Sequence, residues 1–270
     1  MREFGKFLII APLLGIVLYG IRDYKSMEVM LSLQEYIIST HGGVCERLNP
    51  SVELKYLMDL FPYYVFMIIF STFIYRHFCY CSVYVFSRCE KRLWWFRNEA
   101  AKMFIYTVSY VVLLIVSGVV ILHFRNIIEI DKSGMIFLIK HIAVMTLWLY
   151  ANTLLANILA ILIGSRFAVL TIFACQVVCL FSVGTIVTGN DGNITKLQLF
   201  RIRSSYYMNI IPTLHTLKGK GEEMFNALRA GIRYSTSIVY YSVFVLVILA
   251  IGMLVLQKID IIDDDREEVN

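Results

Sequence analysis

Three stretches of this chain, residues 103–124, 167–187 and 238–256, stay apolar over lengths close to 20 residues. A helix needs roughly 20 apolar residues to cross about 30 Å of hydrocarbon. Inside a bilayer the backbone polar groups must bond within their own segment, which a helix achieves. These runs therefore predict transmembrane helices.

The composition fits this prediction. Of the 270 residues, 59% are hydrophobic and 17% are charged, whereas ordinary globular domains have about 45–50% and 25%. The net charge of +5 is modest, and the basic residues form short clusters between apolar runs. A nucleic-acid surface would show a basic patch or stripe, so no nucleic-acid partner is expected.

Three further runs are predicted spans with less regular boundaries. Residues 7–21 follow a basic start, and a signal peptide is the alternative, but no small-x-small cleavage site follows. Residues 60–75 are short for a span and would need tilt or flanking side chains that reach the interface. Residues 135–163 are longer, and Lys140 and His141 near their start indicate a first turn in the interface.

The sequence thus predicts an all-α, polytopic membrane protein with six transmembrane helices in a single domain, residues 1–270. Residues 23–59 and 188–237 are then extracellular segments. Residues 76–102 and both termini lie on the opposite side. The short turn at residues 164–166 forces the fourth and fifth helices into an antiparallel hairpin.

The orientation depends on the basic residues. Fewer than half of the 25 Lys and Arg fall on the side of the termini. The orientation rule, however, weighs short loops next to helices and largely ignores long translocated segments. The densest short cluster is in residues 88–102. We therefore expect this segment and both termini to be cytoplasmic.

The longer outer segment contains an amphipathic pattern. In residues 220–235 most charged residues lie away from one helical face. That face consists of four apolar residues: Met224, Phe225, Leu228 and Ile232. A short helix or re-entrant turn against the outer leaflet is expected there.

Motifs for catalysis are missing from the sequence, which contains no phosphate-binding loop, no His-Glu-x-x-His and no Gly-x-Ser-x-Gly. An enzyme is not expected. His141 is the residue that an intramembrane hydrolase or proton relay would use, although a packed histidine is the favoured interpretation. The six cysteines form no disulfide framework, and no metal site is expected from them.

Four polar residues lie deepest in the apolar runs, and in hydrocarbon such groups normally face other helices. They either pack helices together or line a translocation pathway: Asn152, Thr153, Asn157 and Gln176.

The segment before the third span is basic and rich in tryptophan. Its side chains can lie at the membrane interface, with the tryptophans in the aromatic belt and the cations at anionic head groups. An amphipathic helix held flat there can also present its polar face to a partner protein. The candidate partner-coupling residues are Arg88, Lys91, Arg92, Trp94, Trp95 and Arg97.

In its order of features the chain resembles the permease subunits of ABC-2-type transporters, in particular the small six-helix Gram-positive ones of bacteriocin or lantibiotic export and immunity. Residues 84–95, Tyr-Val-Phe-Ser-Arg-Cys-Glu-Lys-Arg-Leu-Trp-Trp, match the family's cytoplasmic segment, in which Arg, a small or basic cluster and Trp precede the third helix. A long outer loop between the last two helices is also similar. The resemblance implies a type V exporter-like architecture in a bacterial cell membrane.

It also implies that the coupling segment docks on a separate ABC ATPase subunit, which binds ATP and Mg²⁺, so that this chain holds no cofactor. A second permease subunit, identical or related, would complete the pathway. Export of a peptide, lipid-like molecule or antimicrobial amphiphile is expected, because the spans carry few of the charges that ion pathways need. The alternatives are an intramembrane lipid-modifying enzyme and a non-catalytic membrane scaffold.

Overall fold

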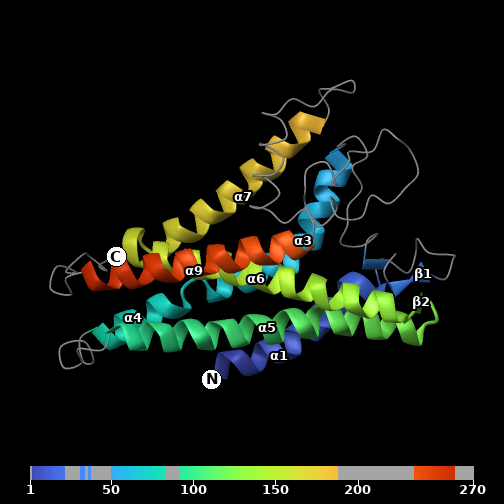
Figure 1. The fold of residues 1–270 in the computed structure, drawn as a ribbon, viewed down its shortest axis with the longest axis horizontal. Coiled ribbons are helices and arrows are strands. Elements are labelled where there is room, and N and C mark those ends of the chain that lie inside the picture. Colours follow the sequence, from blue (N-terminus) through green and yellow to red (C-terminus); the bar gives the residue numbers. More distant parts are fainter. Residues whose placement is uncertain are drawn as a thin grey trace.

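The computed structural model describes residues 2–21, 31–33, 36–37, 50–82, 92–187 and 234–258. These residues are almost entirely helical, which confirms the all-α class. Figure 1 shows the arrangement of the elements α1 (Arg2–Gly15), η1 (Ile16–Ile21), α3 (Pro50–Phe70), α4 (Phe73–Ser82), α5 (Arg92–Phe124), α6 (Lys132–Ile163), α7 (Ser165–Val187) and α9 (Tyr234–Lys258).

Three helices are long and apolar enough to cross a membrane: α5, α6 and residues Ser235–Lys258 of α9. This places the chain among helical membrane proteins. The three other predicted spans also fall on helices, namely α1 with η1, α3 with α4, and α7. The described residues of α1 with η1 and of α7 include only shorter apolar helices, Ile9–Leu18 and Ser165–Gln176. Six transmembrane helices therefore remain a prediction.

The predicted span at residues 60–75 differs from the structure. The helix begins earlier, at Pro50, so the predicted outer segment 23–59 ends in helical residues. It also stops at Phe70 and resumes as α4 at Phe73. The two helices run in clearly different directions (Figure 1). One predicted span is thus a pair of helices with a break between them.

The coupling segment was expected to form a separate interfacial helix before a span at residues 103–124. Instead, α5 is one helix of 33 residues that begins at Arg92. Between Arg92 and Met103 the sequence has no glycine or proline and is rich in good helix formers, so nothing breaks the helix there. At 1.5 Å per residue α5 is about 50 Å long, more than the hydrocarbon thickness.

Helix α7 follows α6 after Gly164, the only residue between them. Gly164 has φ 88°, and its N–H donates to the Ala160 carbonyl. A positive φ of this kind suits glycine, which has no Cβ. α7 returns alongside α6 and then splays away from it (Figure 1). The predicted hairpin is present, with a turn of one residue where residues 164–166 were expected.

The start of α6 is capped by Asp131, whose carboxylate accepts hydrogen bonds from the Ser133 hydroxyl and the Gly134 N–H. The Ser133 bond is the main cause of a lowered pKa for the Asp131 carboxyl. Just before this cap, β2 (Ile128–Glu129) pairs in parallel with β1 (Leu31–Ser32). The α5–α6 turn is thereby tied to the segment that follows η1.

Close helix packing depends on two glycines. A Cβ on Gly15 of α1 would collide with the Leu114 carbonyl oxygen of α5. A Cβ on Gly252 of α9 would lie 2.5 Å from Phe96 Cζ and 2.9 Å from Ile158 Cδ1. Small residues allow such close approach between membrane helices. α9 therefore packs directly against α5 and α6.

Candidate functional site

The most distinctive polar site of the described residues lies where α3 gives way to α4. In a continuous helix the Ile74 N–H would donate to the Phe70 carbonyl, four residues earlier. Here the Asn157 carboxamide of α6 occupies that position: Ile74 N donates to Asn157 Oδ1 at 2.7 Å, and Asn157 Nδ2 donates to Phe70 O at 2.8 Å. An inserted side chain is an established cause of a helix kink.

Asn157 is fully buried, and its amide makes further contacts. Nδ2 also donates to the Thr153 carbonyl at 2.8 Å on its own helix and lies 3.6 Å from Met103 Sδ of α5. Every polar atom of the amide thus has a partner, as a buried amide requires. Asn157 joins α3, α4 and α6, and therefore acts between helices.

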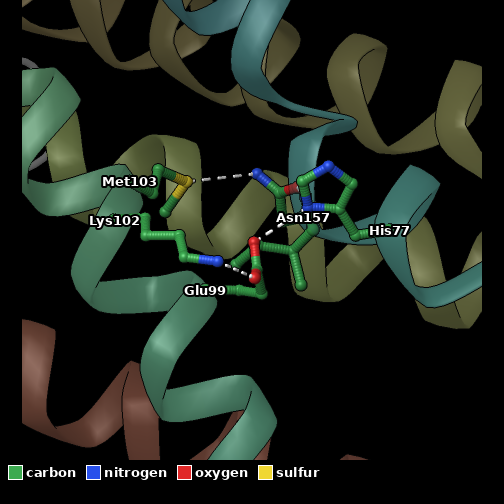
Figure 2. A network of polar contacts seen from close by, with 6 residues as sticks. His77, Glu99, Lys102, Met103 and Asn157 are labelled. Atoms are coloured by element: carbon green, nitrogen blue, oxygen red, sulfur yellow. Dashed lines mark hydrogen bonds and ion pairs between the residues drawn. The ribbon is translucent and has the colours of Figure 1, made fainter. Parts of the chain in front are cut away.

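A second group of polar side chains lies beside Asn157 (Figure 2). Glu99 of α5 has only 7% of its side chain exposed. Its Oε2 lies 2.8 Å from Nδ1 of His77 on α4, and its Oε1 lies 2.6 Å from Nζ of Lys102, one turn further along α5. Met103 follows Lys102 directly and touches Asn157. We call Asn157, Glu99, His77, Lys102 and Met103 the polar cluster.

The predicted coupling residues are only partly described. Arg88 and Lys91 lie outside the described residues. Arg92, Trp94, Trp95 and Arg97 belong to the first two turns of α5.

The two tryptophans do not share one face. Trp94 is 57% exposed, and Arg97, one turn later, is also exposed. Trp95 is half-buried, with its ring 6.4 Å from the ring of Phe78 on α4. Adjacent helical residues point about 100° apart, so Trp95 packs toward α4 while Trp94 and Arg97 face outward.

The inner face of the same turns is fixed by packing. Phe96 is buried against Gly252 of α9. The Ala100 carbonyl accepts a hydrogen bond of 3.0 Å from the Tyr150 hydroxyl of α6. Together with the Glu99–His77 pair, these contacts connect the start of α5 to three other helices.

The other polar residues predicted for a pathway or for packing have different surroundings. Asn152 donates to the Trp148 carbonyl at 2.9 Å, and Thr153 donates to the Leu149 carbonyl at 2.7 Å, both within α6. Gln176 is buried on α7, with 3% exposed. The structure therefore brings only Asn157 of the four into the polar cluster.

His141, the residue of the enzyme alternative, is 1% exposed on α6. Trp148 lies on the same helical face, two turns later, and packs edge-on against Tyr63 of α3 with ring centres 6.2 Å apart. Within the described part of the chain, no group of three or more His, Cys, Asp or Glu side chains could hold a metal ion. Cys79 and Cys175 are exposed there.

No local spacing in the sequence connects Glu99 with His77, because the two residues are 22 residues apart on different helices. The Glu99–Lys102 spacing of three residues was a readable signal for an ion pair on one helix.

Comparison with known proteins identifies no relative: no protein-family model, curated protein or solved structure matches the chain.

Proposed function

We propose that this chain is the permease subunit of an ABC transporter of the ABC-2 type, driven by a separate ATPase subunit. The observation that carries the proposal is the continuity of α5 from Arg92 to Phe124. Residues 92–102 extend the apolar stretch at residues 103–124 by about 16 Å, at 1.5 Å per residue. A partner that binds these turns would act on a rigid rod reaching through the bilayer.

The two faces of the opening turns suit this role. The outward face, with Leu93, Trp94 and Arg97, offers apolar and cationic contacts to a partner. The inward face, with Phe96 and Glu99, is attached to α9 and α4. A push on the outward face would therefore move several helices together.

The arrangement of the ends also supports the proposal. Helix α4, the start of α5, the α6–α7 turn and the end of α9 lie at the same end of the bundle (Figure 1). This end carries basic residues of several elements: Arg76, Arg92, Arg97, Lys102, Arg166 and Lys258. Basic residues next to membrane helices favour the cytoplasmic side, where an ATPase subunit would bind.

A pathway formed by two permease subunits belongs to the same proposal. Helices α7 and α9 expose large apolar side chains, including Leu170, Val178, Val243 and Leu246. These faces suit lipid or a second permease chain. An exported peptide, lipid-like molecule or antimicrobial amphiphile would move between the two subunits in a bacterial cell membrane.

The experiment reverses the two arginine charges of the opening turns, of which Arg92 is half-buried and Arg97 is exposed. The double variant Arg92→Glu, Arg97→Glu is compared with the wild-type chain after mild detergent extraction and affinity purification. Loss of a charge pair at a protein interface commonly costs about 2–5 kcal/mol. We expect an ATPase with Walker motifs to co-purify with the wild-type chain and to be lost from the double variant, with membrane insertion unchanged.

The matched control is Lys132→Glu, an exposed basic residue at the first position of α6, near the other end of α5. It changes one charge in the same direction and should retain the ATPase. Absence of any Walker-type ATPase from the wild-type preparation would contradict the proposal. Equal ATPase recovery and ATP hydrolysis with the double variant would also contradict it, since the opening turns of α5 would then be a membrane anchor only.

A further inference from the structure

We propose that Ser71 and Thr72 form a two-state hinge, at which α4 changes its direction relative to α3, and that the Asn157 carboxamide holds the bent state. In the second state the amide withdraws, the Ile74 N–H donates to the Phe70 carbonyl, and α3 and α4 become one helix. This inference concerns the chain itself and does not depend on a transport function.

No proline or glycine causes the break. Residues 67–76 contain neither proline nor glycine, which are the usual causes of a sharp kink. Regular helical bonds continue on both sides, with Ser71 N donating to Met67 O and Arg76 N donating to Thr72 O, both at 2.8 Å. The Ser71 hydroxyl donates to the Ile68 carbonyl at 2.8 Å, and a bond of this kind bends a helix only slightly. The interruption is local, and the amide inserted from α6 takes the place of the missing Phe70–Ile74 bond.

The hydrogen bonds of the Asn157 amide favour the bent state. In the bent state the Asn157 amide bonds Phe70 O, Ile74 N and Thr153 O. In the straight state the Phe70–Ile74 bond replaces two of these, and the bond to Thr153 on the same helix is kept. The straight state has one hydrogen bond fewer and leaves Oδ1 of the buried Asn157 amide without its Ile74 partner, which favours the bent state by a factor of about 5 to 160. Such a difference is small enough for a partner or ligand to reverse.

The neighbouring ion pair can open during the same movement. His77 lies on α4, one turn after Ile74, so straightening would draw it away from Glu99 on α5. Glu99 would keep Lys102, which lies on its own helix. The His77 side chain is 45% exposed and can be hydrated after separation. The link between α4 and α5 can thus break without leaving a buried carboxylate unpaired.

The test measures the distance between two spin labels across the hinge in the full chain, reconstituted in lipid nanodiscs. One label is attached at Phe61→Cys, an exposed position of α3, and the other at Cys79, which is exposed on α4. The remaining cysteines are replaced by serine. Eighteen residues of straight helix span about 27 Å, and the bent state gives a shorter distance.

We expect the labelled parent chain to show mainly the short distance. Asn157→Ala removes the inserted amide and should shift the main peak to the straight-helix distance. Asn157→Leu keeps a branched side chain without the amide and should give the same readout, so either variant is sufficient if the other fails to insert. Adding Ile74→Pro removes the N–H that the straight helix needs, and should restore the short distance.

The matched control is Asn152→Ala. Asn152 lies on the same helix as Asn157, but its amide donates to the Trp148 carbonyl within that helix. Removing the Asn152 amide should therefore leave the distance unchanged. An unshifted distance in the Asn157 variants would overturn the proposal. An equal shift in Asn152→Ala, or a shift that Ile74→Pro fails to reverse, would also overturn it, because the change would then be a general loosening.

Discussion

Buried polar side chains in this protein act differently according to the partner that each one reaches. Asn157 bonds the backbone of another segment, whereas Asn152 and Thr153, about one turn away, bond carbonyls of their own helix. Glu99 resembles Asn157 in this respect, because it reaches His77 on α4. Residue type alone does not separate the residues that join helices from those that do not.

At the residue scale we predict that Glu99 stabilises the contact between α4 and α5. Glu99→Ala removes a buried acceptor from two donors and should lower the free energy of unfolding by about 1–3 kcal/mol. Lys102→Ala should cost less than about 1 kcal/mol, because the Lys102 side chain is 54% exposed. Reversible unfolding in mixed micelles, followed by circular dichroism, measures both. Equal effects of the two variants would show that burial of Glu99 contributes nothing.

At the scale of elements, the helices approach one another through small residues and through long continuous rods. α5 contacts α4, α6 and α9 near its start and α1 further along, at Gly15. Its Tyr110 hydroxyl donates to the Pro62 carbonyl of α3 at 2.7 Å. Because α5 is unbroken, these contacts share one rigid element.

Gly252 provides the test of this packing. Gly252→Val places carbon atoms where Phe96 and Ile158 already lie. The overpacking should cost about 1–3 kcal/mol, again measured by unfolding in mixed micelles. Ala250→Val is the control, because Ala250 lies two residues earlier on α9 and is exposed. A Gly252 variant as stable as the control would mean that α9 does not pack closely against α5.

At the scale of the whole molecule, the six-span topology with both termini in the cytoplasm is a prediction that labelling can check. In intact cells that carry single-cysteine variants of the protein, an impermeant maleimide should react with Cys45 and not with Cys89. Both cysteines lie outside the described residues. Permeabilised cells provide the control, in which Cys89 should react. Labelling of Cys89 in intact cells would reverse the orientation and move the opening turns of α5 away from any cytoplasmic partner.

Local sequence determined where the helices are. A bilayer-spanning helix has a continuous apolar sequence, because a polar group that is not bonded within the segment is unfavourable in hydrocarbon. Five of the six predicted runs accordingly fall wholly on helical residues, and the sixth, residues 60–75, falls on α3 and α4 with a break at residues 71–72. The short turn between α6 and α7 could be predicted for the same reason, since Gly164 separates two apolar runs.

Only the tertiary structure decided where α3 ends and which polar residues join helices. Residues 60–75 read as a single run, and the break at Ser71 and Thr72 comes from an asparagine 83 residues away from Ile74. The contact of Glu99 with His77 likewise depends on how α4 folds back on α5. Hydrophobic periodicity records the environment along one helix. It cannot record a side chain that arrives from another helix and replaces a backbone hydrogen bond.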